Sequence, residues 1–226
     1  MPNYSIVPSL DWKHLLTLLG NEVKLILDIG ANDGGTSSVF QKLFPTAVVH
    51  AFEPDPRAIS NCRRRVALGN IEHSRFNLHE VAVSDYDGVG KFFPSFGHNP
   101  NFPWYVTGND LSGSLNEPLS VRQVGQEWLQ FGESIDVKVV RLDSWLSEWP
   151  TEQIDLCHMD VQAGELRVIK GGKSVMSKSR YIFLECEDAL NYKEQPTIDE
   201  ISSQLDCHTL IIKYLDGNYM FKRNGE

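Results

Sequence analysis

The sequence predicts an α/β fold in which a mostly parallel β-sheet carries helices on both faces. Three observations predict this fold. Apolar runs typical of buried strands alternate along the chain with segments of helical period. A glycine-rich turn over residues 28–36 (DIGANDGGT) connects the first apolar run to a helix. Near the C-terminus, Asp216-Gly217 separates two apolar runs, which is the pattern of a β-hairpin and reverses the direction of the last strand.

The first half of the chain alternates helices and strands. Each expected strand is a short apolar run, and each expected helix has a glycine or proline after it. In order, the elements are a helix over about residues 9–19 capped by Ser9, a strand over 23–29, a helix over 36–44, a strand over 47–52, a helix over 56–68 capped by Asp55, and a strand within 71–84.

An irregular segment then interrupts the alternation over about residues 85–135. It is rich in Gly, Pro, Asn, Ser and aromatic residues and has no clear period, so we expect an insertion on the substrate side of the site. The elements expected after it are a strand over 137–142 that pairs near Lys91, a strand over 154–161, a helix over 164–170, a strand over 180–186, and a helix that begins at the capping box 197–200.

Size and composition limit the kinds of protein to consider. The 226 residues are 41% hydrophobic and 23% charged, which fits a single domain over residues 1–226. A formal net charge of −9 argues against nucleic acid or an anionic membrane surface as the partner. No apolar run approaches the roughly 18 residues of a spanning helix, and the N-terminus lacks the basic-then-apolar order of a signal peptide. The four cysteines form no C-x-x-C pair, so we expect a protein of the reducing cytoplasm.

The glycine-rich turn predicts a site for a nucleoside-containing cofactor. Glycines permit a tight turn and close approach of a ligand, and the following helix presents unpaired N–H groups. Glu53 ends the next strand, where a carboxylate commonly accepts hydrogen bonds from both hydroxyls of a ribose. Turns of this kind also occur for packing alone, but the presence of Glu53 at the end of the next strand favours a cofactor site.

Asp28 at the tip of the first strand distinguishes between cofactors. A carboxylate there repels a pyrophosphate and attracts an ammonium group, directly or through water. S-adenosylmethionine has such an ammonium group, a ribose and no phosphate. A nicotinamide-dependent oxidoreductase is the first alternative, disfavoured by Asp28 and by the terminal hairpin. The second alternative is a non-catalytic protein that binds S-adenosylmethionine and acts as a partner of another protein.

Four segments of the chain resemble the successive motifs of the FkbM-type methyltransferases, which depend on S-adenosylmethionine and have the Rossmann-like class I methyltransferase fold. They are VKLILDIGANDGGTSS, HAFEPDP, HEVAVSD and MDVQAGELRVIKGG, and the resemblance runs from about Val23 to Lys222. The family usually has glycine where this chain has Ala163. The resemblance implies a seven-stranded sheet whose last strand is antiparallel, and O-methylation of a hydroxyl on a sugar or a secondary metabolite.

The resemblance also implies where the cofactor binds. It places the methionine end at Asp28, Gly30, Ala31 and Asn32, the ribose at Glu53 with Phe52 and Pro54 on either side, and the adenine edge at Glu80, Val81 and Ala82. Asp160 is expected to contribute to the cofactor site as well. Ser114 matches a serine-containing segment that members of the family carry before the strand VKVVRL.

Acidic residues at the carboxyl ends of the later strands are the candidates for catalysis. Methyl transfer to an alcohol is an in-line displacement, and a general base helps by taking the hydroxyl proton. Asp160 and Glu185 end two strands and Glu165 opens a helix, and we expect all three in the site, with Asp160 as the base or as the group that orients the acceptor. The alternative is that Asp160 caps a turn and Glu165 only favours the positive end of its helix. A divalent metal ion between Asp160 and Glu185 is a further alternative that we do not favour.

The acceptor is expected to be a small molecule or a glycan. Phe96, Trp104 and Tyr105 belong to an aromatic-rich stretch whose ring faces suit a sugar or a polyketide-like molecule, and Ser114 is expected to contact the same acceptor. Packing of these rings into a small core of their own segment is an equally good interpretation. His158 is expected to be a core histidine with its hydrogen bonds satisfied. The oligomeric state is left open.

Overall fold

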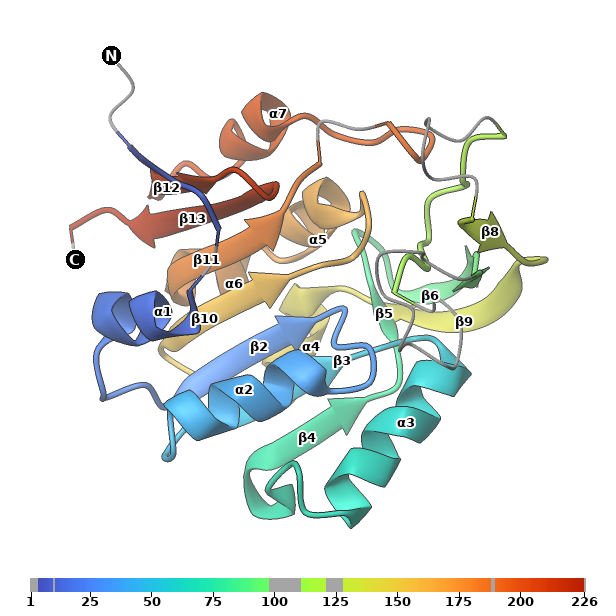
Figure 1. Ribbon diagram of the computed structural model, residues 1–226. Coiled ribbons are helices and arrows are strands. Elements are labelled where there is room, and N and C mark those ends of the chain that lie inside the picture. The colour runs from blue at the N-terminus through green and yellow to red at the C-terminus, as the bar shows by residue number, and fades with distance from the viewer. Residues whose placement is uncertain (1–3, 10, 98–110, 121–127, 188–189, 226) are drawn as a thin grey trace.

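A large β-sheet organises the molecule. The computed structural model describes residues 4–9, 11–97, 111–120, 128–187 and 190–225. Eight strands form the sheet in the order β1-β12-β13-β11-β10-β2-β3-β4 (Figure 1). Neighbouring strands run parallel, except that β13 is antiparallel to both β11 and β12. The predicted fold class is therefore confirmed, and β1 adds a strand at the edge that the sequence analysis did not anticipate.

The bounds of the elements are as follows. The strands of the main sheet are β1 (Ser5–Val7), β2 (Leu25–Ile29), β3 (Val48–Phe52), β4 (Phe76–His79), β10 (Ile154–Met159), β11 (Ser179–Glu185), β12 (His208–Tyr214) and β13 (Asn218–Arg223). The helices are α1 (Trp12–Leu19), α2 (Gly35–Leu43), α3 (Pro56–Ala67), α4 (Leu142–Glu148), α5 (Glu165–Gly171), α6 (Lys173–Lys178) and α7 (Ile198–Ser202), and a 3-10 turn η1 (His73–Arg75) precedes β4.

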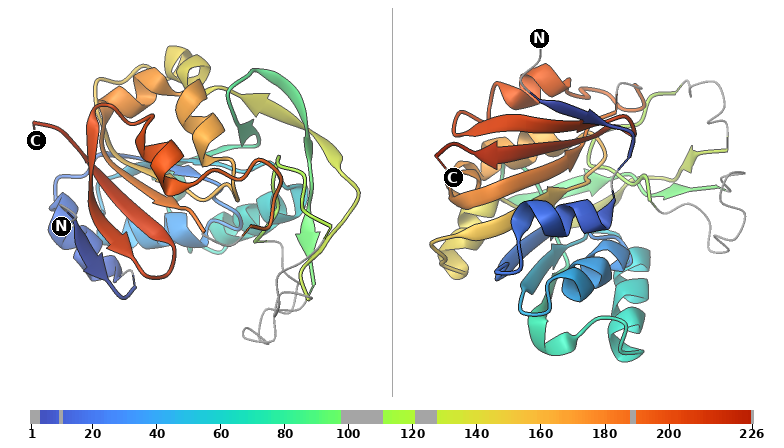
Figure 2. Two further views of the ribbon diagram at one scale, coloured as in Figure 1. Left: turned by 90° about the horizontal axis from the view of Figure 1, so that it is seen from above. Right: turned by 60° about the vertical axis from the view of Figure 1, so that its left-hand side comes forward.

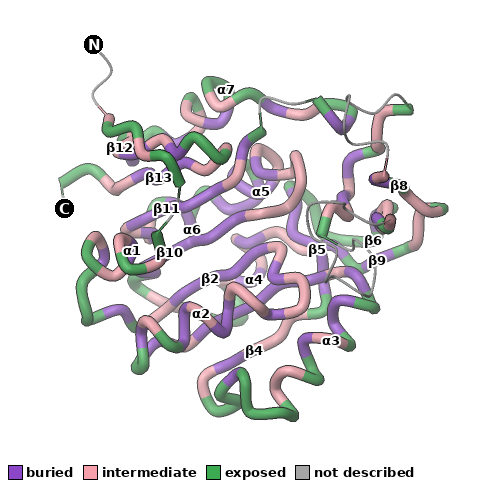
Figure 3. Tube along the Cα trace, in the orientation of Figure 1, coloured by how far each residue is buried: buried purple, intermediate pink, exposed green. Residues whose placement is uncertain are grey.

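Helices cover both faces of the main sheet, which buries its central strands. The left view of Figure 2 shows α1 to α3, in blue to cyan, on one side and α4 to α6, in yellow to orange, on the other. The first face packs on Leu15, Phe40 and Cys62, and the second on Trp145, Ile169, Met176 and Ile201. All six residues of β10 are buried, and β2 is buried from its second residue onward (Figure 3). Continuous apolar runs, without strand alternation, are what a sheet covered on both faces requires.

The chain order of the strands creates a crevice at one end of the sheet. From β2 the chain moves outward through β3 to β4, and it later returns to the other side of β2 as β10. Loops that leave two neighbouring strands in opposite directions leave a space between them at the carboxyl ends. In Figure 1 the arrowheads of β2, β10 and β11 point toward this end.

The segment expected to be irregular contains β-structure in its described part. β6 (Gly88–Phe92) pairs antiparallel with β9 (Ile135–Val140), and β5 (Ala82–Val83) pairs parallel with β9, which makes a three-stranded sheet. β7 (Ser95–Phe96) pairs with β8 (Gln130–Phe131). Lys91 faces Asp136 in this register, so the pairing predicted near Lys91 is confirmed. Both small sheets stand beyond the carboxyl ends of the main sheet (Figure 1).

Several predicted boundaries need correction. Asp11, rather than Ser9, caps α1, because its side chain accepts a hydrogen bond from the backbone N–H of Lys13. The strand predicted over 137–142 ends at Val140, and α4 begins at Leu142. Helices α4 and α6 were not predicted from the sequence. The capping box at Thr197 is present as predicted. No helix within the described ranges is both long and apolar enough to cross a lipid bilayer.

Candidate active site

A cavity of about 590 Å³ lies at the carboxyl ends of the central strands, between the main sheet and the two small sheets. Its size is in the range of small-molecule sites. Residues expected to bind the cofactor that line it are Gly30, Asn32, Phe52, Glu53, Pro54, Val81, Ala82 and Asp160. The cavity therefore joins expected cofactor residues from four separate stretches of sequence.

The glycine-rich turn after β2 is shaped by its protein neighbours. Gly30 has φ +84°, and a Cβ atom there would lie 1.8 Å from the backbone oxygen of Asp160. Gly34 has φ +77°, and its Cβ would lie 2.7 Å from a methyl carbon of Ile71 and 2.9 Å from Cys62 Sγ. Glycine at these two positions allows β2 to meet the end of β10 and allows α2 to pack beside α3.

Asp28 requires a correction. It is fully buried beneath the turn and is not among the residues that line the cavity. Its carboxylate accepts a hydrogen bond from Ser37 Oγ and lies 2.8 Å from Nδ1 of His158. The expected direct contact between Asp28 and the amino-acid end of a cofactor is not supported by this position, because both carboxylate oxygens are engaged inside the protein. His158 is the satisfied core histidine that the sequence predicted.

Glu53 is held rigidly at the end of β3. One carboxylate oxygen accepts from the backbone N–H of Asn32 at 2.8 Å, and the other accepts from the backbone N–H of Asp55 at 2.7 Å. The side chain lines the cavity although only 5% of the residue is exposed. Two backbone donors fix the direction in which the carboxylate presents its remaining lone pairs.

Three further candidates lie elsewhere than expected. Ala31 is buried and does not line the cavity, and Glu80 is exposed and forms an ion pair with Arg63. Phe96, which is 38% exposed, lies on β7 outside the cavity lining. Trp104 and Tyr105 lie outside the described residues.

Carboxyl groups gather at the opposite wall of the cavity, at the ends of β10 and β11. Asp160 and Glu185 both line the cavity, and the side-chain amide of Gln162 donates to Asp160 Oδ1 at 2.7 Å and to Glu185 Oε2 at 2.9 Å. The charge of Asp160, together with burial, raises the pKa of Glu185 to about 10. Burial and the neighbouring carboxylate therefore favour the protonated form of Glu185, as is usual where two carboxyl groups share one site.

Glu165 lies behind this wall and does not line the main cavity. It is buried, and its Oε1 accepts from the backbone N–H of Val161 at 3.0 Å. Burial raises the pKa of Glu165 to about 8, although hydrogen bonds from three backbone N–H groups oppose the shift. Its expected catalytic role is not supported by this position, and its contact with Val161 instead fixes the turn that carries Gln162.

The turn between β10 and α5 has an unusual backbone. Gln162 has φ +53° and Ala163 has φ +74°, a conformation that glycine adopts more readily than other residues. Ser114 Oγ donates to the backbone oxygen of Gln162 at 2.6 Å, and Asn116 Nδ2 donates to the backbone oxygen of Ala163 at 3.0 Å. Ser114, expected to contact the acceptor, does line the cavity, but its hydroxyl proton is engaged by the turn.

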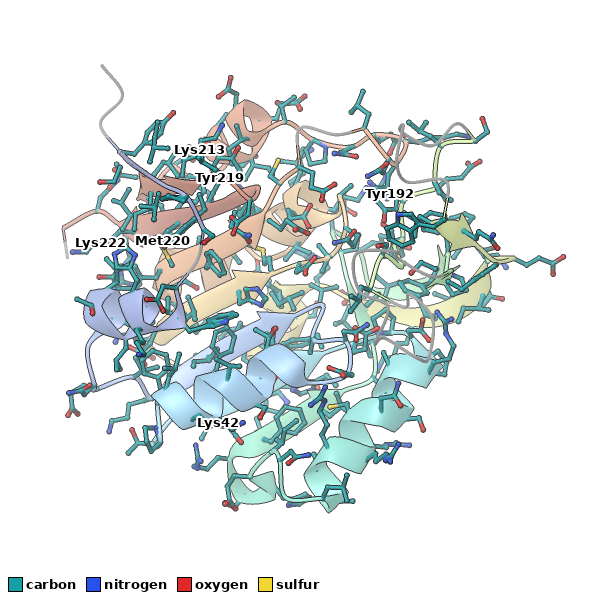
Figure 4. The ribbon with its side chains drawn as sticks, in the orientation of Figure 1. Lys42, Tyr192, Lys213, Tyr219, Met220 and Lys222 are labelled. Carbon is teal, nitrogen blue, oxygen red and sulfur yellow. The ribbon has the colours of Figure 1, made fainter. Side chains whose placement is uncertain are left out.

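Some residues of the site were missed from the sequence. Tyr192 is buried beside the cavity and donates from its hydroxyl to the backbone oxygen of Ser112 at 2.6 Å. In Figure 4 it lies on the side of β8, far from the labelled residues of β12 and β13. Burial raises the pKa of Tyr192. Arg167 also lines the cavity and pairs with Glu194. Tyr192 stands in no quoted motif, whereas Gln162 and Arg167 both lie inside the quoted segment MDVQAGELRVIKGG.

The described part of the chain contains no group of three or more His, Cys, Asp or Glu side chains arranged to hold a metal ion. His50 and His79 pair with each other through ring nitrogens 2.9 Å apart. Burial lowers the pKa of both imidazoles to about 4, so both are neutral at physiological pH.

Known proteins are similar to this chain in sequence and in fold. Residues 28–211 match the methyltransferase FkbM domain. The 2-O-methyltransferase NoeI of Sinorhizobium fredii is 38% identical over 205 residues, which cover 91% of this chain and 80% of NoeI. The 31-O-demethyl-FK506 methyltransferase FkbM of Streptomyces tacrolimicus is 29% identical over 155 residues, which cover 65% of this chain and 58% of that protein.

A solved structure shows the same fold at low sequence identity. The crystal structure of methyltransferase FkbM from Methylobacillus flagellatus superposes with a TM-score of 0.55 at 11% identity. The superposition covers 89% of this chain, which spans 44% of that protein.

Proposed function

This chain belongs to the methyltransferase FkbM family, and on that premise we propose that it transfers a methyl group from S-adenosylmethionine to a hydroxyl of a sugar or secondary-metabolite acceptor. The observation that carries the proposal is the cavity in which a rigid acceptor of hydrogen bonds, Glu53, lies across from the carboxyl pair of Asp160 and Glu185.

The charges around the cavity fit this cofactor better than a dinucleotide. Glu53, Asp160, Glu185 and Glu187 line it, and Arg167 is the one cationic side chain among its described lining residues. S-adenosylmethionine carries an ammonium and a sulfonium charge, both of which an acidic wall attracts. A nicotinamide cofactor carries a pyrophosphate, which the same wall repels.

Individual residues would hold the parts of the cofactor. The Glu53 carboxylate suits the two ribose hydroxyls, because its orientation is already fixed by Asn32 and Asp55. Val81 and Ala82 offer an apolar wall beside the end of β4 that suits the adenine ring. Gly30 and Asn32 remain on the side expected to face the amino-acid end.

The carboxyl pair would handle the proton of the acceptor. When bound, S-adenosylmethionine supplies an electrophilic methyl group on a positively charged sulfur, and the sulfur leaves as a neutral thioether. Asp160 would align the acceptor hydroxyl and take its proton as the new oxygen–carbon bond forms. Glu185, whose pKa is raised by Asp160 and by burial, would favour its protonated form beside Asp160.

The names of two relatives support oxygen as the acceptor atom. One is a 2-O-methyltransferase and the other acts on 31-O-demethyl-FK506. A base at the cavity wall supports the same choice, since an alcohol must lose a proton when it is methylated.

The test is methyl transfer from isotopically labelled S-adenosylmethionine to a panel of methyl glycosides and hydroxylated macrolactones. We expect label in at least one product, with the new ether located by mass spectrometry, and no loss of activity after dialysis against EDTA. Binding of S-adenosylhomocysteine without transfer to any compound would favour the non-catalytic alternative. Binding of NAD in place of S-adenosylhomocysteine would favour the oxidoreductase.

A further inference from the structure

Gln162 is the one side chain among the described residues that donates to both members of the carboxyl pair. A carboxamide nitrogen has two hydrogens, and here one is directed to Asp160 Oδ1 at 2.7 Å and the other to Glu185 Oε2 at 2.9 Å. Its amide oxygen lies 3.2 Å from the hydroxyl of Tyr192. The single proton of that hydroxyl is donated to the backbone oxygen of Ser112 at 2.6 Å, so the firm partners of the amide are the two carboxyl oxygens.

The backbone at Gln162 is held in place at a cost in conformational energy. A non-glycine residue at φ +53° is strained, and the next residue, Ala163, has φ +74°. Ser114 and Asn116 bind the two backbone oxygens of this pair. A strained backbone persists where surrounding contacts hold it in place. Here the held backbone places the amide of Gln162 against the cavity wall.

The amide of Gln162 is a donor that Asp160 and Glu185 share. The negative charge of Asp160 repels any charge on Glu185, and without the amide the pair loses its shared donor. Methyl transfer depends on alignment of the acceptor oxygen with the methyl group and the sulfur, so a displaced carboxylate lowers the rate.

We propose that Gln162 is a positioning residue: its amide fixes the Asp160 carboxylate at the cavity wall, in the orientation that receives the proton of the acceptor hydroxyl. This inference rests on the proposed function for the identity of the reaction. The placement of Asp160 by Gln162 is a separate claim about the protein alone.

The experiment uses two variants and one matched control. Gln162→Met keeps the length of the side chain and removes both donors. Gln162→Gly removes the side chain and relieves the strained backbone, so a loss of activity in it cannot come from strain. Ala163→Gly gives the same backbone relief at the neighbouring residue and keeps the amide.

Three measurements are made on each variant. With the best acceptor found in the panel, kcat of both Gln162 variants is expected to fall by about 10- to 100-fold, while KM and the Kd for S-adenosylhomocysteine change by less than about threefold. Ala163→Gly is expected to keep the wild-type kcat. Crystal structures of both Gln162 variants are expected to show Asp160 in more than one rotamer, and that of Ala163→Gly in one.

Wild-type kcat in either Gln162 variant would overturn the inference. So would a single, unmoved Asp160 rotamer in both Gln162 variants. If the wild-type protein methylates no compound of the panel, the proposed function fails, and the crystal structures still decide whether Gln162 positions Asp160.

Discussion

At the scale of single residues, Glu53 gives the most direct test of the cofactor site. Glu53→Gln replaces one charged acceptor oxygen with a donor, while the side chain keeps its size. We expect binding of S-adenosylhomocysteine to weaken by about 1.5–3 kcal/mol, which is the value of a hydrogen bond to a charged group. Isothermal titration calorimetry measures the change. Glu80→Gln is the matched control, because Glu80 lies outside the cavity lining and should leave the Kd unchanged.

A variant of Asp160 distinguishes an effect on turnover from an effect on cofactor binding. Asp160→Asn keeps the shape and removes the basic oxygen, so kcat is expected to fall by about 100-fold or more while the Kd for S-adenosylhomocysteine changes little. Single-turnover kinetics with the labelled cofactor measure both quantities. Equal activity of variant and wild type would remove Asp160 from the role of base. Asp143→Asn, on α4 and outside the cavity lining, is the control.

The sequence predicted Asp28, Glu53 and Asp160 as residues of the site, and of these Glu53 and Asp160 line the cavity whereas Asp28 does not. All three follow or end apolar strands, and a strand pattern does not say which face of the sheet a terminal side chain takes when both faces are covered. Asp28 turns toward Ser37 and His158 in the protein interior. Glu53 instead turns toward the cavity, where backbone N–H groups of Asn32 and Asp55 hold it.

At the scale of elements, the turn between β10 and α5 contains strain that a substitution can remove. Ala163 has φ +74°, which costs a non-glycine residue about 1–2 kcal/mol. Glycine avoids that cost but adds about 0.4–1 kcal/mol of entropy to the unfolded chain. We therefore expect Ala163→Gly to raise the free energy of unfolding by about 0.5–1 kcal/mol in urea titrations. Ala58→Gly, in the regular helix α3, is expected to lower it.

The pair of His50 on β3 and His79 on β4 predicts a dependence of stability on pH. Both imidazoles have a pKa lowered to about 4 by burial, against 6.5 ordinarily. Between these pH values the unfolded chain binds more protons than the folded one. The contribution of the two histidines to the free energy of unfolding is therefore fully present above about pH 6.5 and decreases as the pH falls toward 4. Thermal unfolding across this range measures the slope.

The matched comparison uses one histidine of the pair and one exposed histidine. His79→Phe keeps the stacking on Phe52 and removes one titrating group, so the decrease in Tm toward pH 4 is expected to become smaller. His73→Gln changes an exposed histidine of η1 and should leave the slope unchanged. An identical slope in His79→Phe would contradict the assigned cause.

The order of the longer elements was predictable from the sequence, whereas the shortest strands were not. Strands β2, β3, β10 and β11 are apolar runs, and α3 begins at the predicted cap, Asp55. β1, β7 and β8 have only two or three residues each, and pairing partners elsewhere in the chain define them. No local pattern contains that information.

At the scale of the whole molecule, ligand binding should stabilise the fold by mass action. S-adenosylhomocysteine at 100 times its Kd adds about 2.7 kcal/mol to the free energy of unfolding, which corresponds to an increase in Tm of about 5–10 °C for a chain of this size. NAD at the same concentration is expected to leave Tm unchanged, because the cavity wall is acidic. Differential scanning fluorimetry measures both. An increase with NAD alone would contradict the choice of cofactor.

The expectations that residues 1–226 form one domain and that the protein is cytoplasmic stay predictions. The acceptor contacts expected of Trp104 and Tyr105 stay predictions too, because these residues lie outside the described ranges.

The sequence by itself determined the alternation of strands and helices, the reversed last strand at Asp216-Gly217, the glycine turn and the family to which the chain belongs. These features depend on neighbours close in the chain, or on motifs that a few adjacent residues define. Only the tertiary structure decided that Asp28 is enclosed in the protein interior while Glu53 lines the cavity. It also decided that the amide of Gln162 connects Asp160 to Glu185. Such contacts join residues from different strands, and their geometry is fixed by the packing of the sheet and its covering helices rather than by local sequence.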